Sequence, residues 1–405
     1  MELLKLAWRN LWRNRKRTLI TIASIFFGVI WSALLTSLQE GSFQNMVDNM
    51  VKFTTGYIQV QHVDYFDNKT INNSFESSSE LTDLLDSQEK ITIYTPRLES
   101  FALAASDNKS YGTAVIGINP EVENQISELS KWVVEGEYLS ADKKGVIIGE
   151  ILAKNLELKV GDTIALIGQG YHGVQSAGLF PVRGLLKFPV PDLNRQILYM
   201  NLPMAQEFYE APNLITSMIV MAPGPKEVNH AMKELRKNDL SELAIFTWEE
   251  LQPQLVQFID GKKSSGKIFK GILFMLIAFG ILGTFIMMMA ERKRELGIMV
   301  AIGMQRAKLS VILFLESIFI AAIGVLSSIA ILMPVISYFA KSPIPITGDT
   351  AETFSDMGFE PVVIFNNDWQ IFSGPAITIF VIALLISIYP ISSIFNFKVV
   401  KALRS

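Results

Sequence analysis

Long uninterrupted runs of hydrophobic positions mark four places in the chain. Each run is long enough to cross about 30 Å of hydrocarbon as a helix that rises about 1.5 Å per residue. The predicted transmembrane helices are residues 18–38, 268–290, 309–338 and 371–395. Residues 39–267 have ordinary globular composition and are numerous enough for a folded domain. The pattern therefore predicts a membrane α-helical protein that carries one large domain between its first and second spans.

Shorter patterns within residues 39–267 predict that this domain is mixed α/β. "YIQVQHV" and "YGTAVIGI" alternate like strands, and "GVIIGEILAKNLEL" is typical of a strand that runs into a helix. "KVGDTIALIG" predicts a turn at Gly161 followed by a further strand, whereas "MNLPMAQEFYEA" and "EVNHAMKELRKN" predict helices. The polar residues 67–86 predict a loop or linker. We expect a sheet-based core with an inserted lobe.

The distribution of charge orients the predicted spans. Basic residues are concentrated in an amphipathic N-terminal helix, in a connecting loop and in the tail, which are residues 1–17, 291–308 and 396–405. The loop over 339–370 instead holds five acidic residues against one base, Lys341. Because Lys and Arg favour the cytoplasmic side, the three basic segments are predicted to be cytoplasmic. The large α/β domain and the 339–370 loop are then extracytoplasmic.

Composition narrows the class of protein further. Half of the 405 residues are hydrophobic and 19% are charged, which is typical of a membrane protein. The net charge of -3 and the absence of a basic run outside the segments beside the spans give no indication of nucleic-acid binding. With no cysteine, the outer domain has neither disulfides nor a lipid-modified cysteine. The first span predicts a retained signal anchor rather than a cleaved signal peptide.

Two motifs resemble nucleotide-binding loops, but the sequence around each of them does not fit such a loop. "GQGYHG", Gly168–Gly173, follows a predicted strand but precedes a second strand rather than a helix, so we interpret it as a hairpin tip. "GKKSSGKI", Gly261–Ile268, has an isoleucine where a phosphate-binding loop needs Ser or Thr, and a span follows it. The histidines are scattered and form no metal-binding pair: His62, His172 and His230. We expect no catalysis, no metal site and no directly bound cofactor in this chain.

The connecting segment Glu291–Ile302 concentrates charge at its start and apolar residues after it, and Gly303 is placed to end a helix. It predicts a short amphipathic helix at the cytoplasmic surface. One interpretation is a membrane-interface turn whose basic residues only obey the positive-inside rule. The other is a docking element for a partner, and the residues alone leave both open.

Two further features of the spans have alternative interpretations. A stripe of small residues recurs every four positions in the first span: Ser24, Gly28, Ser32 and Thr36. It predicts close helix packing at a dimer or cavity seam, or packing against a helix of the same subunit. Glu316 lies inside the third span, where a carboxylate must snorkel or pair. It either anchors near the cytoplasmic face, with Lys308 or an N-terminal arginine as partner, or transmits motion.

The run "MAERKRELGIMVAIGMQRAKLSVILFLESIFIAAIG" resembles the signature of the FtsX/MacB-type permeases of ABC transporters. The resemblance extends in order along the whole chain, through "LAWRNLWRNRKRTLIT", "GVIIGEILAKNLELKVGDTIAL" and "YPISSIFNFKVVKALRS". It implies that the 291–308 loop is the coupling helix that docks onto an ATPase. The residues assigned to coupling are Glu291, Arg292, Lys293, Arg294, Glu295, Gly297, Ala301 and Gly303.

By architecture the chain is most similar to the lipoprotein-releasing permeases of the Lol system, LolC and LolE. That resemblance implies a bacterial inner-membrane protein whose MacB-like core domain, residues 39–267, lies in the periplasm. The implied partners are a cytoplasmic ABC ATPase dimer that binds ATP and Mg²⁺, a second permease that is identical or paralogous, membrane lipids, a lipoprotein substrate and a periplasmic carrier. The positions comparable to a carrier-binding hairpin are Gly170, Tyr171, His172 and Gly173, and a plain exposed hairpin is the alternative.

Three functions of different classes follow from these observations. The first is a permease subunit that transmits ATP-driven motion to its periplasmic domain and extracts lipoproteins from the inner membrane. The second is a related mechanotransmission permease that exports another substrate or activates a periplasmic cell-wall hydrolase. The third is a membrane-anchored sensor or enzyme without an ATPase, against which the resemblance along the whole chain argues most directly.

Overall fold

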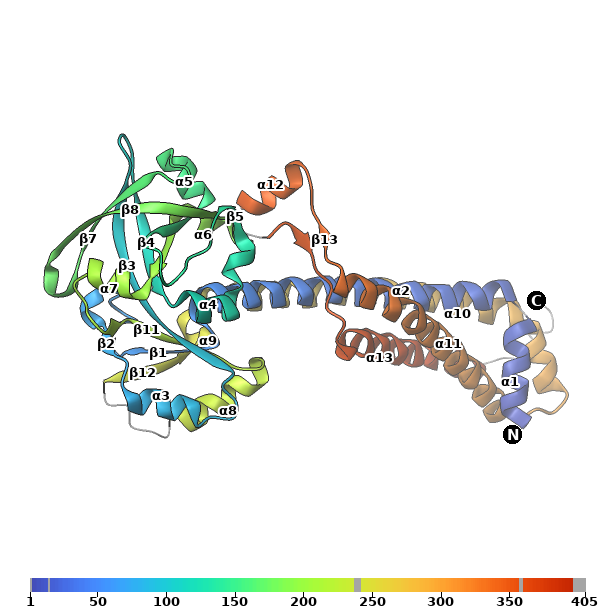
Figure 1. Ribbon diagram of the computed structural model, residues 1–405. Helices are drawn as coiled ribbons and strands as arrows, with labels where there is room; N and C mark the ends of the chain where they lie inside the picture. The colour runs from blue at the N-terminus through green and yellow to red at the C-terminus, as the bar shows by residue number, and fades with distance from the viewer. Residues whose placement is uncertain (1, 14, 237–241, 357–359, 396–405) are drawn as a thin grey trace. The chain divides into compact units, whose positions relative to one another are not determined.

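The computed structural model describes residues 2–13, 15–236, 242–356 and 360–395 (Figure 1). The predicted tail, 396–405, lies outside the described residues. The chain forms two compact units. The helical unit comprises Met1–Gln44, Ile259–Pro345 and Val362–Ser405, and the α/β unit comprises Asn45–Phe258 and Ile346–Pro361.

Long apolar helices and shorter helices at their ends build the helical unit. They are α1 (Glu2–Arg13), α2 (Arg15–Met50), α10 (Pro253–Ala301), α11 (Arg306–Lys341), α13 (Trp369–Ile386) and α14 (Ile388–Phe395). Within the described residues, four helical segments are long and apolar enough to cross a membrane: Arg15–Thr55, Pro253–Ala301, Arg306–Lys341 and Trp369–Phe395. The four apolar helices predicted from the sequence are therefore confirmed, and each helical segment extends beyond its predicted span.

The helix α10 corrects one prediction. Glu291–Ile302 was expected to be a separate short helix, but α10 continues without a break from Pro253 to Ala301. The sequence "FIMMMAERKRELG" contains no proline and consists largely of good helix formers, so nothing ends the helix at the membrane boundary. The helix ends where predicted, because Gly303 adopts the left-handed φ of +104° that favours glycine.

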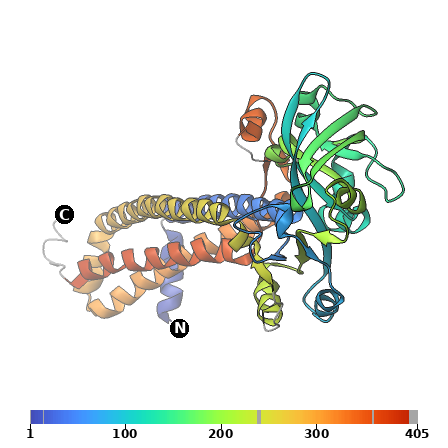
Figure 2. The ribbon, with the colours of Figure 1, turned by 90° about the vertical axis from the view of Figure 1, so that its left-hand side faces the viewer.

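Apolar side chains from several helices form the core of the helical unit. Ile25 of α2, Phe285 of α10, Ile320 of α11 and Ile379 of α13 are all buried in one cluster. The helices approach closely at Gly324, where an added Cβ would lie 2.7 Å from Cγ2 of Ile25. The helices α2 and α10 run side by side (Figure 2).

A ten-stranded sheet forms the centre of the α/β unit, in the order β12-β1-β11-β3-β4-β9-β6-β8-β5, with β7 paired to β3 and β8. Its strands are β1 (Ile58–His62), β3 (Ile93–Ala105), β4 (Ser110–Ile118), β5 (Val133–Gly136), β6 (Val146–Gly149), β7 (Thr163–Gln169), β8 (Gln175–Leu186), β9 (Ile197–Asn201), β11 (Ser217–Met221) and β12 (Leu243–Thr247). The pairs β4–β9 and β6–β8 are parallel, and the others are antiparallel. The sheet confirms the predicted α/β core.

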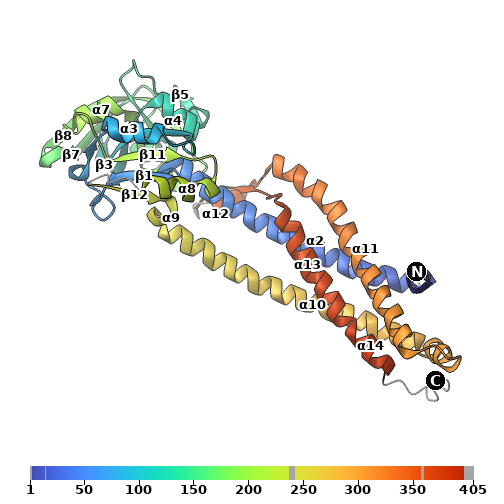
Figure 3. The same ribbon diagram turned by 90° about the horizontal axis from the view of Figure 1, so that it is seen from below.

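Short elements cover and extend this sheet. The helices are α3 (Ser79–Asp86), α4 (Pro120–Ser127), α5 (Glu150–Leu156), α6 (Pro191–Gln196), α7 (Leu202–Phe208), α8 (Pro225–Leu235), α9 (Trp248–Leu251) and α12 (Asp349–Asp356). Two small sheets pair β2 (Phe75–Glu76) with β10 (Leu214–Ile215), and β13 (Ile344–Pro345) with β14 (Val362–Val363). The helices α3 and α8 lie together on one face of β1, β11 and β12 (Figure 3).

Most local predictions for the α/β unit are confirmed. The predicted strand-to-helix segment forms β6 and α5, and the turn before β7 contains Gly161 with a φ of +96°. The loop predicted over 67–86 is wrong in its second half, which forms α3. The hydroxyl of Ser78 accepts a hydrogen bond from the backbone N–H of Leu81 and begins this helix.

The segment Ile346–Pro361 belongs to the α/β unit, although the sequence placed it in a separate loop over 339–370. Asn45 donates a 2.7 Å hydrogen bond to Glu360, and Asn49 donates one of 3.2 Å. These bonds attach the segment to the last turns of α2. The following π-helical turn, Val51–Thr55, ends at Gly56, which has a φ of +65°.

Candidate functional site

Near the end of α10, a buried ion pair joins this helix to α11. Arg292 Nη1 lies 2.6 Å from Glu316 Oε2, and Nη2 donates a 3.4 Å hydrogen bond to Oε1. Only 9% and 2% of the two side chains are exposed. Taking a charge out of water costs several kcal/mol, so Glu316 requires this partner. The expectation that Lys308 or an N-terminal arginine pairs with Glu316 is therefore wrong.

Two of the N-terminal arginines pair with the two glutamates of α10 instead. Arg13 of α1 pairs with Glu295, and Arg17 of α2 pairs with Glu291. Glu295 also lies 3.8 Å from Nε of Arg292. The result is an arginine–glutamate network that joins α1, α2, α10 and α11, and its members are Arg13, Arg17, Glu291, Arg292, Glu295 and Glu316.

The other residues assigned to coupling divide between the interior and the surface. Gly297 is buried and Lys293 is half-buried. The exposed members are Arg294, Ala301 and Gly303. Ile298 and Ile302 follow Arg294 at intervals of four residues, and 82% of Ile302 is exposed. Arg294, Ile298, Ala301 and Ile302 thus form an outward surface, here named the α10 docking face, that carries both charge and apolar area.

The small-residue stripe of α2 contacts α10 within the same chain. A Cβ added at Gly28 would lie 2.8 Å from Cδ1 of Ile277, and Thr36 accepts a 3.2 Å hydrogen bond from Nζ of Lys270. Ser32 is fully buried, whereas the Ser24 hydroxyl bonds to the carbonyl of its own helix at Ile20. Among the described residues, the stripe therefore packs inside the subunit at Gly28 and Thr36, one of the two alternatives that the sequence left open.

The "GQGYHG" motif is a hairpin tip, as predicted, because β7 and β8 pair in register from Thr163–Pro181 to Gln169–Gln175. Gly170 is buried. The side chain of Tyr171 packs against the core, and its backbone N–H donates a 2.8 Å hydrogen bond to the carbonyl of Tyr209. The backbone N–H of His172 donates to the side chain of Asn72. His172 and Gly173 are exposed. The candidate carrier contact is thus a fixed tip with a small exposed surface.

The second nucleotide-like motif is also accounted for. Gly261–Ile268 lies within α10, where backbone amides are committed to helical hydrogen bonds and cannot cradle a phosphate. No group of three or more His, Cys, Asp or Glu side chains in the described part of the chain could hold a metal ion.

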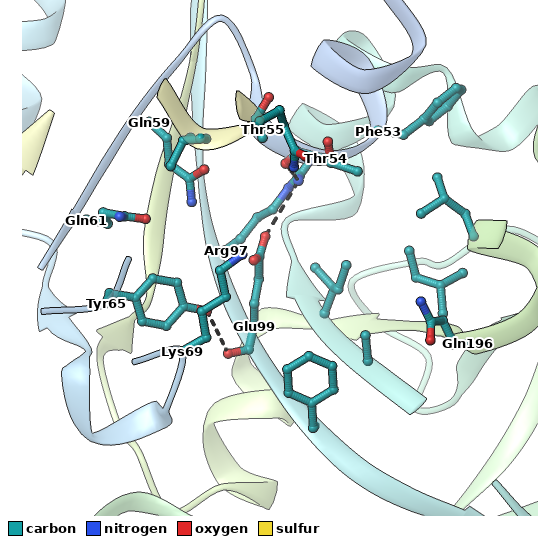
Figure 4. A pocket seen from close by; sticks show the side chains of 17 residues that line it. Phe53, Thr54, Thr55, Gln59, Gln61, Tyr65, Lys69, Arg97, Glu99 and Gln196 are labelled. Carbon is teal, nitrogen blue, oxygen red and sulfur yellow. Dashed lines mark hydrogen bonds and ion pairs between the residues drawn. The ribbon is translucent and has the colours of Figure 1, made fainter. Parts of the chain in front are cut away.

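The α/β unit contains a pocket of about 290 Å³ that the sequence did not predict (Figure 4). Its polar wall comes from β1, β3 and the loop after β1: Gln59, Gln61, Tyr65, Lys69, Arg97 and Glu99. Its apolar wall comes from β3, β4, β9 and the helical turn that continues α2: Phe53, Phe101, Ala114, Ile116 and Ile197. The pocket is therefore amphipathic.

Arg97 is the centre of the polar wall and is fully buried. Its Nε and Nη2 donate to Glu123 at 3.1 and 2.7 Å, and Nη1 donates to the carbonyl of Thr54 at 2.5 Å. Burial alone would lower the pKa of Arg97, but the adjacent Glu123 carboxylate more than offsets this, and the pKa is raised. Arg97 stays charged and fixes the end of the helical turn Val51–Thr55.

Glu99 lies beside Arg97, with 3.7 Å between Oε1 and Nη1. Burial raises the pKa of the Glu99 carboxyl, although Arg97 and Lys69 act to lower it. Three charged side chains line this wall: Lys69, Arg97 and Glu99. Glu123, which does not line the pocket, pairs with Arg97, so the basic and acidic groups here balance.

Several neutral polar side chains next to Arg97 have a buried donor or acceptor atom without a hydrogen-bond partner in the described part of the chain. Gln61, Ser217 and Arg97 are direct cross-strand neighbours on β1, β11 and β3, so they share one face of the sheet. Gln61 Nε2 and Ser217 Oγ are buried and have no hydrogen-bond partner among the described residues, and the same holds for Oγ1 of Thr95. Gln61 is 1% exposed and lines the pocket.

The sequence contained a signal for this pocket in "IYTPRLESFALAA". Arg97, Glu99, Phe101 and Leu103 alternate along one strand and therefore point to one face. Two charges followed by two large apolar side chains on one strand face indicate a surface that changes from polar to apolar. The strands that complete the pocket come from distant parts of the chain, so its shape could not be predicted.

Two family models match the chain. The "MacB-like periplasmic core domain" matches residues 18–238, and the "FtsX-like permease C-terminal" matches residues 267–399. The first covers more than half of the chain. The second contains the end of α10 and all of α11.

Similarity to individual proteins is distant but extends along most of the chain. A lipoprotein-releasing system transmembrane protein, LolC of Neisseria meningitidis serogroup B, is 19% identical over 77% of this chain and 75% of its own length. The pyoverdine export ATP-binding/permease protein PvdT of Pseudomonas syringae is 22% identical over 82% of this chain and 51% of its own length. The periplasmic region of MacB from Actinobacillus actinomycetemcomitans is 16% identical, with a TM-score of 0.35 over 52% of this chain and 98% of that structure.

Proposed function

This chain belongs to the FtsX/MacB-type family of ABC transporter permeases, and from that premise we propose that it transmits ATP-driven motion to an outer domain in order to extract lipoproteins. The family implies a cytoplasmic ATPase partner and dimerisation of the permease. In the proposal, the ATPase is a separate dimer and the second permease is a copy or a paralogue. The α/β unit lies in the periplasm, between the first and second spans, and the membrane is the bacterial inner membrane.

The observation that carries the proposal is the arginine–glutamate network. It connects the end of α10 to α1, α2 and α11 through ion pairs, one of which is buried. The α10 docking face lies on the same helical end and remains exposed. An ATPase that pulls on the docking face would therefore move these helices together rather than bend one of them.

The path from the network to the α/β unit follows covalent and buried links. The helix α2 begins at Arg15, beside the network, and runs to Met50. The turn Val51–Thr55 continues it, and Arg97 holds the carbonyl of Thr54. A displacement of α2 would thus reach a fully buried side chain of the central strand β3. This arrangement supports the mechanotransmission step of the proposal.

The substrate assignment rests on the distant similarity to LolC, whose name describes a lipoprotein-releasing system. We propose that the spans take a lipoprotein from the inner membrane and that the hairpin tip, with His172 and Gly173 exposed, contacts a periplasmic carrier. The similarity to PvdT favours a second candidate, the export of a different substrate, because that protein is named for pyoverdine export.

The test is to purify the full chain from native membranes in mild detergent and identify the bound molecules by mass spectrometry. Lipoproteins that are enriched with the chain and released on addition of ATP would support extraction. A bound soluble molecule without lipoproteins would support export. A bound periplasmic cell-wall hydrolase without lipoproteins would contradict extraction and support the activation of that enzyme.

A further inference from the structure

One face of the sheet is exposed and apolar where the end of β3 pairs with β7 and β7 pairs with β8. Phe101 and Leu103 of β3 point to the same side, and the register places Ile167 of β7 directly opposite Leu103. Ile167 in turn pairs with Ala177 of β8, and Leu179 lies two residues further along that strand. Phe101 is 64% exposed and Leu179 is 73% exposed. These residues form a surface that we name the apolar sheet face.

This surface departs from the usual pattern of an antiparallel sheet. Such a sheet normally presents polar side chains on the face that does not cover the core. Here the opposite face, with Ala102, Ala104 and Leu166, already covers the core. None of the six described positions Phe101, Leu103, Ala165, Ile167, Ala177 and Leu179 carries a charge. A contiguous exposed apolar surface of this kind indicates a binding site.

The apolar sheet face is continuous with the amphipathic pocket. Glu99 and Arg97 precede Phe101 on the same face of β3, and Phe101 itself lines the pocket. The apolar part of β3 runs four residue steps, from Phe101 to Ala105, which span about 13 Å at about 3.3 Å per residue. One leaflet of a bilayer is about 15 Å of hydrocarbon, which is half of about 30 Å. The face is therefore nearly as long as one extended acyl chain.

The polar wall of the pocket, at one end of the apolar sheet face, indicates which head group a bound amphiphile would carry. Lys69, Arg97 and Glu99 line this end, and Glu123 outside the lining neutralises Arg97, so an ion of either sign gains little. Gln61 offers an unpartnered amide nitrogen that needs an acceptor, and Glu99, whose Oε1 lies 3.7 Å from Nη1 of Arg97, has carboxyl oxygens that can accept from a further donor. An amide supplies both an acceptor and a donor, and therefore matches these groups better than a phosphate or an ammonium.

We propose that the α/β unit binds an N-acyl amide amphiphile, with its amide head in the pocket beside Gln61 and Glu99 and its acyl chain along the apolar sheet face. The site lies entirely within the α/β unit. It requires neither an ATPase nor a second permease, so the proposal does not depend on lipoprotein extraction.

Photolabelling of the full chain tests this directly. The protein is placed in phosphatidylcholine nanodiscs, and the probe is N-dodecanoylglycinamide with a diazirine at the end of the chain. Label on the membrane helices serves as an internal reference for probe dissolved in the bilayer. We expect additional label on peptides that contain Phe101–Ala105 and Ala177–Leu179. Excess unlabelled N-dodecanoylglycinamide should remove that label, whereas N-acetylglycinamide, which has the head alone, should not.

Variants distinguish specific binding at this site from non-specific labelling of the surface. Leu179→Ser changes an exposed side chain and should lower the strand label severalfold. Val134→Ser, at an apolar strand position on β5 that is also exposed, should not. Gln61→Met keeps the side-chain length but removes the amide, and should weaken competition by about fivefold, the effect of one lost hydrogen bond. Thermal unfolding confirms that each variant is folded.

Three results would overturn the proposal. The first is label confined to the membrane helices. The second is strand label that neither Leu179→Ser nor Gln61→Met changes, which would mean adventitious binding only. The third is equal competition by N-acetylglycinamide or by a short unacylated peptide, which would assign the site to a peptide. Each result leaves the binding of the ATPase unaffected, so failure here is distinguishable from failure of the proposed function.

Discussion

Breaking the buried pair between Arg292 and Glu316 should cost the helical unit more stability than any exposed substitution near it. Arg292→Met keeps an unbranched side chain but leaves Glu316, at 2% exposure, without its charge partner. A unit-charge pair about 4 Å apart interacts by about 4 kcal/mol at an effective dielectric constant of about 20. Removal of one member of a buried pair typically costs 3–5 kcal/mol, and we expect a loss of about 4 kcal/mol.

The structure predicts that the two partners are not equivalent. Arg292 also lies 3.8 Å from Glu295, so Glu316→Leu leaves the arginine with one remaining acidic neighbour. The cost of Glu316→Leu should therefore be smaller than that of Arg292→Met. The double variant removes both charges and should return to within about 1 kcal/mol of the natural protein, because an apolar pair avoids the desolvation of two ions.

The assay is reversible unfolding in mixed micelles titrated with SDS, followed by tryptophan fluorescence. Trp8 of α1 lies edge-on to Phe319 of α11, with ring centroids 5.5 Å apart, so it reports on the packing around α11, one of the two helices that the pair joins. A cost of Arg292→Met below about 1 kcal/mol would refute the reasoning. Equal destabilisation in the single and double variants would also refute it, because packing rather than charge would then explain the loss.

Three further predictions concern separate parts of the chain. Arg97→Met should destabilise the α/β unit by about 3–5 kcal/mol in denaturant titrations, because it leaves Glu123 buried and unpaired, and a loss under about 1 kcal/mol would contradict this. The raised pKa of Glu99 means that its contribution to stability is fully present below the unfolded value of about 4.5 and is lost as pH rises through the folded pKa. Glu99→Gln should therefore raise stability relative to the natural protein at pH 7 but not at pH 4, and an equal effect at both would disprove the role of ionisation. Gly324→Val should cost about 1–3 kcal/mol in the SDS assay, because its side chain would overlap Ile25, and a neutral result would show that the helices can separate there.

The parts of the fold that depend on neighbouring residues could be predicted from the sequence. The hydrophobic runs predict the long helices, and the strand-to-helix segment before Gly161 predicts β6 and α5. The helix α3 was missed because its segment is polar overall. Its signals were nevertheless present, since Ser78 is a typical N-cap and Leu81 and Leu85 recur at helical spacing and are buried.

The candidate site could be predicted only in part, because its important contacts join distant residues. The coupling role of residues 291–308 is a prediction from the family resemblance, because the local charge pattern alone also left a membrane-interface turn open. Arg292 and Glu316 are 24 residues apart on different helices, so the sequence could not reveal that Arg292 points inward. The division between an internal network and an exposed docking face follows from that orientation. It also shows that a charge reversal at Arg292 would perturb folding as well as docking.

The most direct test of the account is copurification of an ABC ATPase with the full-length chain and with two charge-reversal variants. Arg294 is exposed on the α10 docking face, and Lys341 is exposed at the opposite end of α11 from Arg306, so the two substitutions are matched in charge and exposure. We expect the natural protein and Lys341→Glu to retain the ATPase. The amount of ATPase that copurifies with Arg294→Glu should fall at least tenfold, while the unfolding curve of this variant stays unchanged. Retention by Arg294→Glu, or absence of an ATPase from the natural protein under conditions that preserve other ABC complexes, would contradict this account.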